Sequence, residues 1–370
     1  METKKYRFDE VTINFDKKRI PLSSAQREKR QGTFRYYGAQ GVIDHVDDYI
    51  YDGTYLLIAE DGENLKSKKQ NIAQVVDGQF WVNNHAHIVQ GNEQCDTRFL
   101  CYLINSMDLS GYVTGSAQPK LSQANLNAIT LSLPTLVEQK RIVEYLYMLD
   151  QKIDVNRQIN DNLADLLQTV YQERFGDTSL IANQGILSDI CSYSRDKVAV
   201  SDLNVSTYFS TENMLSGKAG STEATSLPTT SQTTACHKGD TLISNIRPYF
   251  KKIVYCEDNC GCSTDVLCFT PSQPRYSAYL FSTLYADKFF AFMVAGSKGT
   301  KMPRGDKQQI MTYPVVLPSE EELAGFNTIA SPLLEQIYSN SAENKRLSIL
   351  RDTLLPKLMS GEIDVSAIQL

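Results

Sequence analysis

The chain has 370 residues, 42% of them hydrophobic and 22% charged, which is ordinary globular composition and enough apolar material for two cores. Its first ten residues are polar and no apolar run approaches the roughly 18 residues of a membrane span, so we expect a soluble, cytoplasmic protein without a membrane partner. The net charge of −6 argues against a nucleic-acid partner only if the acidic residues are spread evenly.

The acidic residues are concentrated in two segments. Segment 134–177 has five Lys/Arg against eight Asp/Glu, and segment 318–370 has four against eight. The remaining residues carry a net charge of +1, and residues 1–35 alone hold ten Lys/Arg against five Asp/Glu. The charge pattern therefore leaves basic surfaces available for a polyanion.

Residues 1–133 are predicted to form a first globular domain. Short strands are expected at Arg35–Gly38 and Tyr49–Ala59, followed by a turn at Asp61-Gly62. Basic, aromatic and amide side chains suit contacts with phosphates and base edges. The candidate DNA-binding residues of this domain are Lys17, Lys18, Arg19, Arg30, Tyr36, Tyr37, Asn83, Asn84, His85 and Lys120.

The segment Trp81–Val89 is predicted as a single strand, with Asn83, His85 and His87 on one face by alternation. A metal-binding histidine pair is disfavoured, because no acidic or Cys partner is evident. Two interpretations stay open: hydrogen-bonded histidines within a sheet, or asparagines that read adenine edges beside a stacking ring.

Residues 134–176 are predicted to form one long helix that begins after Pro134, with Glu138 in its first turn, and ends near Phe175-Gly176. Apolar and Asn residues recur at alternating spacings of four and three, which is typical of a coiled-coil seam. The members are Ile142, Leu146, Leu149, Ile153, Asn156, Asn160, Leu163, Leu167 and Val170.

Residues 177–317 are predicted to form a second globular domain with a strand at Thr241–Ser244. The candidate DNA-binding residues here are Arg247, Tyr249, Lys251, Lys252, Lys298, Lys301 and Arg304, although a solvated basic loop explains any one of them equally well. The Gly296–Lys301 segment lacks the spacing of a phosphate-binding loop. Cysteines at 236, 256, 260, 262 and 268 lack paired CxxC motifs, which favours buried thiols over zinc, so no metal site is predicted.

Residues 318–370 repeat the first helix at a shift of 184. Identical pairs include Pro134/Pro318, Glu138/Glu322, Leu149/Leu333, Ile153/Ile337, Asn156/Asn340, Asn160/Asn344, Leu163/Leu347 and Leu166/Leu350. Pro332 is expected to divide this second helix, and Pro356 to end or kink its last turn. The two seams should pack as an antiparallel coiled coil, in which the seam asparagines either lie buried and fix register or face water at the edge.

A second repeat lies just upstream of each helix, where Gly115-Ser116, Lys120 and Ile129 match Gly296-Ser297, Lys301 and Ile310 at a shift of 181. The predicted fold is therefore α+β, with two mixed α/β domains separated by two long antiparallel coiled-coil helices in an approximately two-fold internal repeat.

With these features together, the chain resembles the specificity subunits of type I restriction–modification systems. The motifs are YIYDGTYLLIAEDG (49–62), WVNNHAHIV (81–89), LPTLVEQKRIVEYL (133–146) and LLPKLMSGEIDV (354–365). The second copy departs from the family in reading LPSEEELAGF where an EQ pair is usual.

The resemblance implies a phage-defence protein with two target recognition domains, each of which reads one half of a split double-stranded DNA site. The helices would set the gap and dock two methyltransferase subunits that use S-adenosylmethionine. Restriction motor-nuclease subunits that use ATP and Mg would join them. The chain itself would be no enzyme and would need no cofactor.

Three other interpretations compete with this one. A lone adenine methyltransferase is disfavoured, because the chain contains no Pro-Pro for the catalytic tetrapeptide of that class. A coiled-coil scaffold whose domains bind protein predicts no salt-sensitive affinity for duplex DNA. A specificity partner of a related restriction system remains compatible with the sequence.

Overall fold

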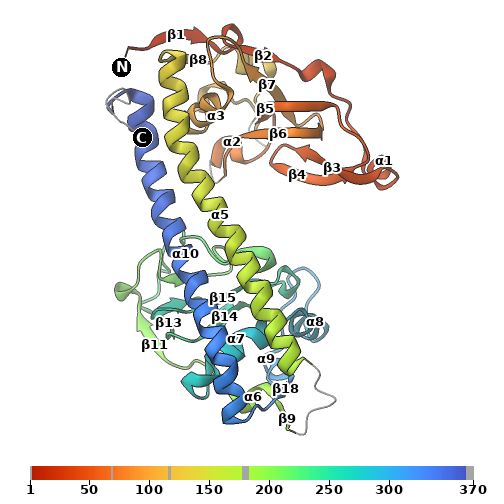
Figure 1. The fold of residues 1–370 in the computed structure, drawn as a ribbon, viewed down its shortest axis with the longest axis vertical. Coiled ribbons are helices and arrows are strands. Elements are labelled where there is room, and N and C mark those ends of the chain that lie inside the picture. The colour runs from red at the N-terminus through yellow and green to blue at the C-terminus, as the bar shows by residue number, and fades with distance from the viewer. Residues whose placement is uncertain (1, 68–69, 116–117, 177–182, 364–370) are drawn as a thin grey trace. The chain divides into compact units, whose positions relative to one another are not determined.

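The structure is a computed structural model that describes residues 2–67, 70–115, 118–176 and 183–363 (Figure 1). The chain divides into two compact units, residues 1–153 with 345–370 (unit 1) and residues 154–344 (unit 2). There are two long helices, α5 (Leu136–Phe175) and α10 (Glu320–Ser360). Each has one part in unit 1 and the other part in unit 2.

Unit 1 is built on a six-stranded sheet of order β2-β7-β5-β6-β3-β4. The strands are β2 (Thr12–Asn14), β3 (Gln31–Gly38), β4 (Gly41–Val46), β5 (Tyr51–Ala59), β6 (Ala73–Val82) and β7 (Ala86–Gly91). A separate ladder pairs β1 (Lys4–Arg7) with β8 (Thr130–Leu133). The helices are α1 (Ser24–Glu28), α2 (Asn64–Ser67), α3 (Thr97–Ser106) and α4 (Gln123–Asn127), with 3-10 turns η1 (Phe8–Glu10), η2 (Asp16–Lys18) and η3 (Ser110–Tyr112).

The central strand β5 explains why this sheet forms. Its residues Leu56 and Ile58 pack in one cluster with buried Phe99 of α3, while Leu57 packs in another with Phe80. Both faces of the strand are thus covered, which accounts for its continuous apolar sequence rather than an alternating one. Leu358 of α10 completes the first cluster.

Unit 2 contains two four-stranded sheets, of order β10-β17-β14-β15 and β11-β13-β16-β12, and a ladder of β9 with β18. The strands are β9 (Gln184–Ile186), β10 (Cys191–Tyr193), β11 (Lys197–Ala199), β12 (Tyr208–Phe209), β13 (Gln232–Cys236), β14 (Thr241–Ser244), β15 (Ile253–Tyr255), β16 (Cys260–Cys262), β17 (Val266–Pro271) and β18 (Pro314–Val316). The helices are α6 (Leu187–Ile190), α7 (Ser277–Tyr285), α8 (Asp287–Ala295) and α9 (Lys307–Ile310). The 3-10 turns are η4 (Val200–Asp202), η5 (Ser216–Lys218), η6 (Pro248–Phe250) and η7 (Pro274–Tyr276).

The two units share a common core topology. The antiparallel order β2-β7-β5-β6 in unit 1 recurs as β10-β17-β14-β15 in unit 2, and the β1–β8 ladder recurs as β9–β18. Each unit then adds its own insertion, the β3–β4 hairpin in unit 1 and the β11-β13-β16-β12 sheet in unit 2. The internal repeat predicted from the sequence is confirmed, and it extends beyond the helices into the sheets.

The long helices α5 and α10 pack antiparallel, as predicted. In unit 1 Arg351 pairs with Asp150 at 2.8 Å, and in unit 2 Asn344 contacts Asn156 at 2.9 Å. Each helix begins with a reciprocal capping box, formed by Thr135 with Glu138 and by Ser319 with Glu322. The second helix thus starts with the same cap as the first, despite its departure from the EQ pair.

The seam asparagines lie inside the helix pair rather than at its edge. Asn156 and Asn340 are buried, and Asn160 and Asn344 are half-buried. Asn340 donates to Asn160 Oδ1 at 2.8 Å, and Asn160 donates to Ser341 Oγ at 3.1 Å. Buried amides that bond one another across a seam penalise every other register, so the first of the two interpretations holds.

The apolar residues of the predicted seam are less enclosed than a uniform coiled-coil core would make them. Ile142, Leu146, Ile153 and Leu167 are buried, but several other seam residues are only half-buried, among them Leu149, Leu163, Leu333, Ile337 and Leu347. A pair of helices encloses its seam from two sides only, so these side chains keep part of their surface exposed unless a domain core covers them. Leu333 does pack against the core of unit 2, which also contains Leu167, whereas Ile142 belongs to the core of unit 1.

The backbone of Ile337 also takes part in the polar layer, because its carbonyl accepts from Asn160 Nδ2 at 3.2 Å. The predicted seam is corrected accordingly. Its apolar contacts are strongest where α5 and α10 join the core of a unit, and the stretch of α5 and α10 that contains Asn156, Asn160, Asn340 and Asn344 is joined by hydrogen bonds instead.

Neither proline interrupts α10, so the expectation of a divided second helix is wrong. Pro332 and Pro356 are exposed, and so are Thr328 and Asp352, whose carbonyls lose their helical N–H partners. Water can satisfy carbonyls on an exposed face. Meanwhile Phe326, Ala330 and Leu334 bury the opposite face and hold the helix continuous.

Replacing Pro332 with alanine is therefore expected to raise the free energy of unfolding by about 1–3 kcal/mol, because it restores one N–H donor and removes the ring clash. Urea unfolding of the full chain measures the change. Ser331→Ala is the matched control and should shift stability by less than about 0.5 kcal/mol. A lower stability for Pro332→Ala would contradict this account of α10.

Candidate nucleic-acid interface

In unit 1, the turn after β5 is hydrogen-bonded to the loop that precedes α4. Leu121 N donates to Glu60 O at 2.8 Å, and Gly62 N donates to Pro119 O at 3.2 Å. Within the loop, Thr114 and Lys120 exchange two backbone hydrogen bonds of 2.9 and 2.8 Å. The backbone at Lys120 is thereby fixed, while its side chain remains 55% exposed.

Unit 2 contains the same loop pair. Gly305 N donates to Asn245 O at 3.2 Å, and Arg247 N donates to Pro303 O at 2.8 Å. Lys298 and Arg304 exchange two backbone bonds of 2.9 Å, and the Arg304 side chain is 56% exposed. Lys120 and Arg304 are thus exposed cations at equivalent fixed backbone positions, and unit 2 adds Lys298, whose side chain is 79% exposed.

These bonds correct the repeat predicted upstream of the helices. The pairing of Thr114 with Lys120 corresponds to that of Lys298 with Arg304, which is the shift of 184 found for the helices. The shift of 181 is therefore wrong by three residues, and the counterpart of Lys120 is Arg304 rather than Lys301. Lys301 lies exposed within the loop, and Ser116 lies outside the described residues.

Carboxylates hold both cations in place. Lys120 Nζ lies 3.3 Å from Glu60, and Arg304 lies 3.0 Å from Asp265. Burial raises the pKa of Glu60. Hydrogen bonds from Arg19 and Lys120 and the charge of His87 together lower this pKa by more than burial raises it, so the carboxylate stays ionised. A phosphate must compete with these carboxylates, and an exposed pair of this kind is weak enough to exchange.

The other basic candidates of unit 1 divide into exposed lysines and arginines that brace the structure, and among the lysines Lys18 Nζ lies 5.3 Å from the centre of the Phe15 ring. Lys17 and Lys18 are exposed on η2. Arg19 pairs with Asp16 and Glu60 and donates to Ala86 O at 2.9 Å, so it braces the sheet. Arg30 lies over the Trp81 ring at 4.8 Å and pairs with an aspartate at 2.8 Å.

Two predicted contacts do not reach the surface. Tyr36 is fully buried and its hydroxyl accepts from Leu22 N at 2.8 Å, and Tyr37 is buried against Phe80. Alternation along β3 does not expose either residue, because Tyr36 packs with Val46 and Trp81 in one apolar cluster and Tyr37 packs in another. We leave both tyrosines out of the interface.

The single strand predicted over Trp81–Val89 is instead two strands, because β6 ends at Val82 and β7 starts at Ala86, and the two lie on opposite sides of β5 in the sheet. Asn83 and Asn84 form the turn, a role that suits Asn, and Asn83 Oδ1 accepts from His85 N at 2.8 Å. His85 is half exposed and bonds Asp61 at 2.6 Å. The turn therefore presents Asn84 and His85 close to the Glu60–Gly62 turn.

His87 belongs to a buried ion pair that connects the sheet to the loop of Lys120. Its Nδ1 lies 2.6 Å from Asp16, and its Nε2 lies 2.8 Å from Leu121 O. Burial lowers the pKa of His87, but bonding to Asp16 and Leu121 outweighs it and holds that pKa above its usual 6.5. Burial likewise raises the pKa of Asp16, and hydrogen bonds from His87 and Ile88 hold it below 3.8.

Stability should depend on pH through this pair. A raised pKa in the folded state means that the contribution of His87 is complete below about pH 6.5 and is lost as pH rises through the raised value. The depressed pKa of Asp16 means that its contribution is lost as pH falls below 3.8. We expect the thermal midpoint of the wild type to fall above pH 6.5 relative to His87→Gln. The exposed His85→Gln should follow the wild type, and identical slopes for all three would contradict the charged pair.

Most predicted residues of unit 2 gather around the second loop pair. Arg247 opens the η6 turn, Tyr249 is exposed on it, and Lys251 follows it and pairs with Asp287 at 3.0 Å. Lys252 donates to Thr211 O at 2.6 Å, and its burial lowers its pKa. Lys298 pairs with Asp306 at 2.5 Å.

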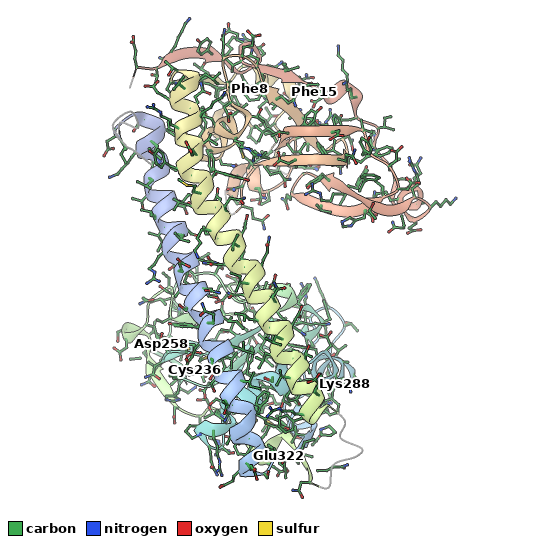
Figure 2. All side chains as sticks on the ribbon, in the orientation of Figure 1. Phe8, Phe15, Cys236, Asp258, Lys288 and Glu322 are labelled. Carbon is green, nitrogen blue, oxygen red and sulfur yellow. The ribbon has the colours of Figure 1, made fainter. Side chains whose placement is uncertain are left out.

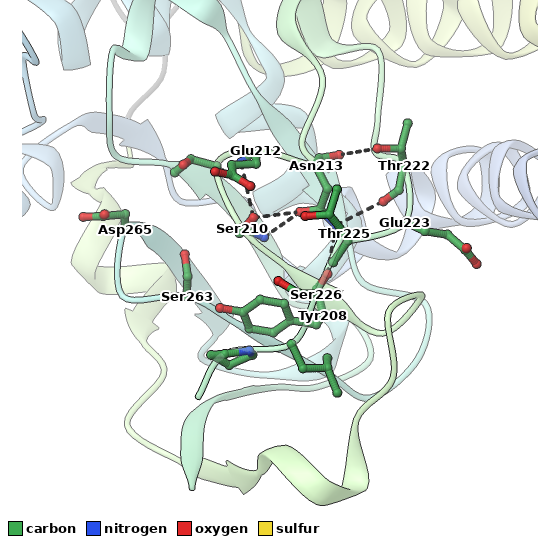
Figure 3. A pocket seen from close by; sticks show the side chains of 14 residues that line it. Tyr208, Ser210, Glu212, Asn213, Thr222, Glu223, Thr225, Ser226, Ser263 and Asp265 are labelled. Carbon is green, nitrogen blue, oxygen red and sulfur yellow. Dashed lines mark hydrogen bonds between the residues drawn. The ribbon is translucent and has the colours of Figure 1, made fainter. Parts of the chain in front are cut away.

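A polar pocket of about 340 Å³ adjoins this loop pair (Figure 3). Its lining includes Tyr208, Ser210, Ser263 and Asp265, the last of which also pairs with Arg304. Buried Asn213 fixes the wall, because its Oδ1 accepts from Ser210 N at 2.7 Å. Hydroxyl and carboxylate groups of this kind can bond base edges. Sequence reasoning missed this pocket, because its residues come from three separate segments of the chain, 208–213, 222–228 and 263–265.

Five cysteines of unit 2 lie in one buried apolar cluster: Cys236, labelled in Figure 2, Cys256, Cys260, Cys262 and Cys268. Cys256 and Cys260 lie with their sulfurs 3.6 Å apart, and Cys268 lies 3.2 Å from Asp240. Within the described residues, no group of three or more His, Cys, Asp or Glu side chains is arranged to hold a metal ion. These thiols fill the core beside β13, β16 and β17.

Residues 2–164 match the family model of the type I restriction modification DNA specificity domain. The chain is 36% identical over 138 residues to a putative type I restriction enzyme specificity subunit of Haemophilus influenzae, a match that covers 37% of this chain and 35% of that relative. It is 26% identical over 125 residues to the EcoprrI specificity subunit of Escherichia coli, covering 33% and 30%. The matches thus span about a third of these curated relatives' length.

A solved S subunit of a type I restriction-modification system from M. genitalium has a similar fold, with a TM-score of 0.59 and 16% identity over 97% of this chain and 96% of that one. At this identity the likeness concerns the fold, which includes both units and both long helices. Among the described residues, no helix combines the length and apolarity that crossing a membrane requires.

Proposed function

Because the chain belongs, through residues 2–164, to the type I restriction-modification specificity family, we propose that it is the DNA-reading subunit of such a complex. It is a non-catalytic specificity subunit and needs no cofactor of its own. Each unit reads one half of a split duplex site, and the long helices set the gap between the halves.

The observation that carries this proposal is the repeated loop pair with its cation. Lys120 and Arg304 occupy equivalent backbone positions, which suits contacts with phosphates that carry no sequence information. The insertions differ, with a hairpin in unit 1 and a sheet with a polar pocket in unit 2. Two domains that recognise different half-sites need similar contacts with the DNA phosphates and different insertions to contact the bases.

The long helices also support the docking of methyltransferase subunits. On α5, Val155, Ile159 and Leu166 are exposed apolar residues at spacings of four and seven, so they share one face that is separate from the seam. An exposed apolar stripe beside a coiled-coil seam suits a partner helix. The partners bind S-adenosylmethionine and methylate adenine, and restriction subunits that use ATP and Mg complete the complex.

The test is co-expression of the full chain with its methyltransferase subunit and mapping of N6-methyladenine across the host DNA. We expect methylation at one split motif, which disappears when the chain is omitted. Deleting one matched heptad from each helix shortens each by about 10 Å, and should change the gap while leaving both half-sites unchanged.

Two outcomes would favour other functions. A stable complex with an active partner and no methylated motif would overturn the proposal and favour a scaffold whose domains bind protein. A motif whose methylation protects it from a cleavage subunit that does not use ATP would instead assign the chain to a related restriction system.

A further inference from the structure

The turn from Arg247 to Lys251 in unit 2 is strained. Among the described residues, the non-glycine residues with positive φ are Lys218 (65°), Arg247 (50°) and Lys251 (50°). All three meet at this turn, because Arg247 and Lys251 flank η6 and Lys218 N donates to Lys251 O at 2.9 Å. Left-handed backbone costs about 1–2 kcal/mol per ordinary residue, and such strain collects at functional sites.

The surrounding structure holds the turn in this shape. Arg247 N is bonded to Pro303 O at 2.8 Å, and the Asp287 carboxylate lies 2.8 Å from Lys218 and 3.0 Å from Lys251. Hydrogen bonds from these two lysines hold the pKa of Asp287 below its usual value. The turn is therefore fixed from both ends before any ligand binds.

Unit 1 shows that the common fold does not need this strain. The residue equivalent to Arg247 is Gly62, which bonds Pro119 O as Arg247 bonds Pro303 O, and it has a φ of 125° that glycine adopts without cost. A second cost falls on Arg247, because its buried Nε has no hydrogen-bond partner among the described residues.

What the strained turn provides is an exposed aromatic pair. In unit 1 the residues after Gly62 turn inward, and Leu65 is buried. In unit 2 Tyr249 is 50% exposed and Phe250 is 37% exposed, with ring centroids 4.7 Å apart. The pair adjoins the loop that carries Lys298 and Arg304, so apolar rings and cations share one surface. Duplex DNA satisfies both, with phosphates for the cations and base faces for the rings.

We propose that Tyr249 and Phe250 form a wedge that enters a base step of the half-site bound by unit 2, and that unit 1 has no such device at the equivalent turn. The inference rests on the proposed function. It makes recognition depend on how readily that step unstacks, so the half-site of unit 2 should contain a flexible pyrimidine–purine step, whereas the other half-site is free of this requirement.

The test uses the full chain in complex with its methyltransferase subunit and duplexes that carry the methylated motif. The adenine analogue 2-aminopurine, which pairs with thymine and whose fluorescence rises when it unstacks, replaces each adenine on either strand of the unit 2 half-site in turn, except the methylated one. Wild-type complex should raise the fluorescence at one step. The double variant Tyr249→Ala with Phe250→Ala should lose that rise and bind about 10- to 100-fold more weakly.

Matched variants separate the wedge from general damage. Tyr249→Phe keeps the ring and should keep the fluorescence rise, and Tyr49→Ala, an exposed tyrosine of unit 1, should behave as wild type. Both rings of the turn are exposed, so the double variant should unfold at the wild-type temperature. A complex that binds its motif with no fluorescence change at any tested base, or a double variant that matches the wild type, would overturn the wedge alone. A complex with no motif preference would overturn the proposed function, and the wedge with it.

Discussion

Replacing Asp16 with alanine is expected to cost about 3–5 kcal/mol of unfolding free energy, because it leaves the buried His87 imidazolium without its carboxylate. Asp16 Oδ2 lies 2.6 Å from His87 Nδ1, and Asp16 Oδ1 accepts from Ile88 N at 2.8 Å. Removing the side chain thus unpairs one charge and one backbone donor inside the core. Denaturant unfolding at pH 6 measures the loss.

The control is Asp47→Ala, which breaks a more exposed pair with Arg30 and should cost less than about 1 kcal/mol. The double variant Asp16→Ala with His87→Leu removes both charges and should recover part of the loss. If Asp16→Ala cost no more than Asp47→Ala, His87 would be neutral in the folded protein. Since His87 also bonds Leu121 O, the single variant should in addition loosen the loop that presents Lys120.

Exchanging Lys120 and Arg304 for glutamine should weaken binding to every duplex sequence alike and reduce its salt dependence. Each removed phosphate contact lowers the slope of log K against log salt by about 0.9, so the double variant should lose about 1.8. Both side chains are exposed and contribute little to the core, so folding should not change. Titration of duplex DNA at several salt concentrations measures the slopes.

Arg157→Gln serves as the control, because Arg157 is an exposed cation on α5 that pairs with Asp154 one turn away. Its salt slope should equal that of the wild type. The single variants should also leave the methylated motif unchanged while lowering its occupancy, since a phosphate contact carries no sequence information. A changed motif would mean that the loop reads bases, and an unchanged slope would exclude the two cations from the interface.

The helices were predictable because one periodic signal dominates them. Alternating spacings of four and three predict the seam of α5. The repeat at a shift of 184 then predicts a second long helix, α10, even though Pro332 and Pro356 argue against a continuous one. Pro332 was wrongly expected to divide the helix because proline is intrinsically unfavourable inside helices. Sequence alone did not show that it lies on the exposed face of a helix whose other face is buried.

The periodic signal did not reveal how deeply each seam residue is buried. Leu149 and Ile153 follow the same spacing, yet the first is half-buried and the second is buried. Spacing along one helix places a side chain on a face, whereas its burial depends on which parts of the fold cover that face.

The interface was less predictable, because its geometry depends on partners far apart in the chain. Asp16 and His87 are separated by 71 residues, and nothing near either one indicates the pairing. The loop register was misjudged because a short match of Gly-Ser and Lys at 181 competes with the true shift of 184, at which Pro119 matches Pro303. The Asn83-Asn84 turn was the one signal present in the sequence and overlooked.

The way α10 completes unit 1 constrains how the protein is made. Leu358 belongs to the same core as Phe8, and Arg351 reaches Asp150 across 201 residues of sequence. A ribosome that has released only the first half of the chain has therefore produced a domain that still lacks one side of its core. Unit 2 comprises residues 154–344, so it can close earlier. The part of the chain that is synthesised first should therefore complete its folding last. Its exposed apolar surface remains available to chaperones until α10 has been synthesised.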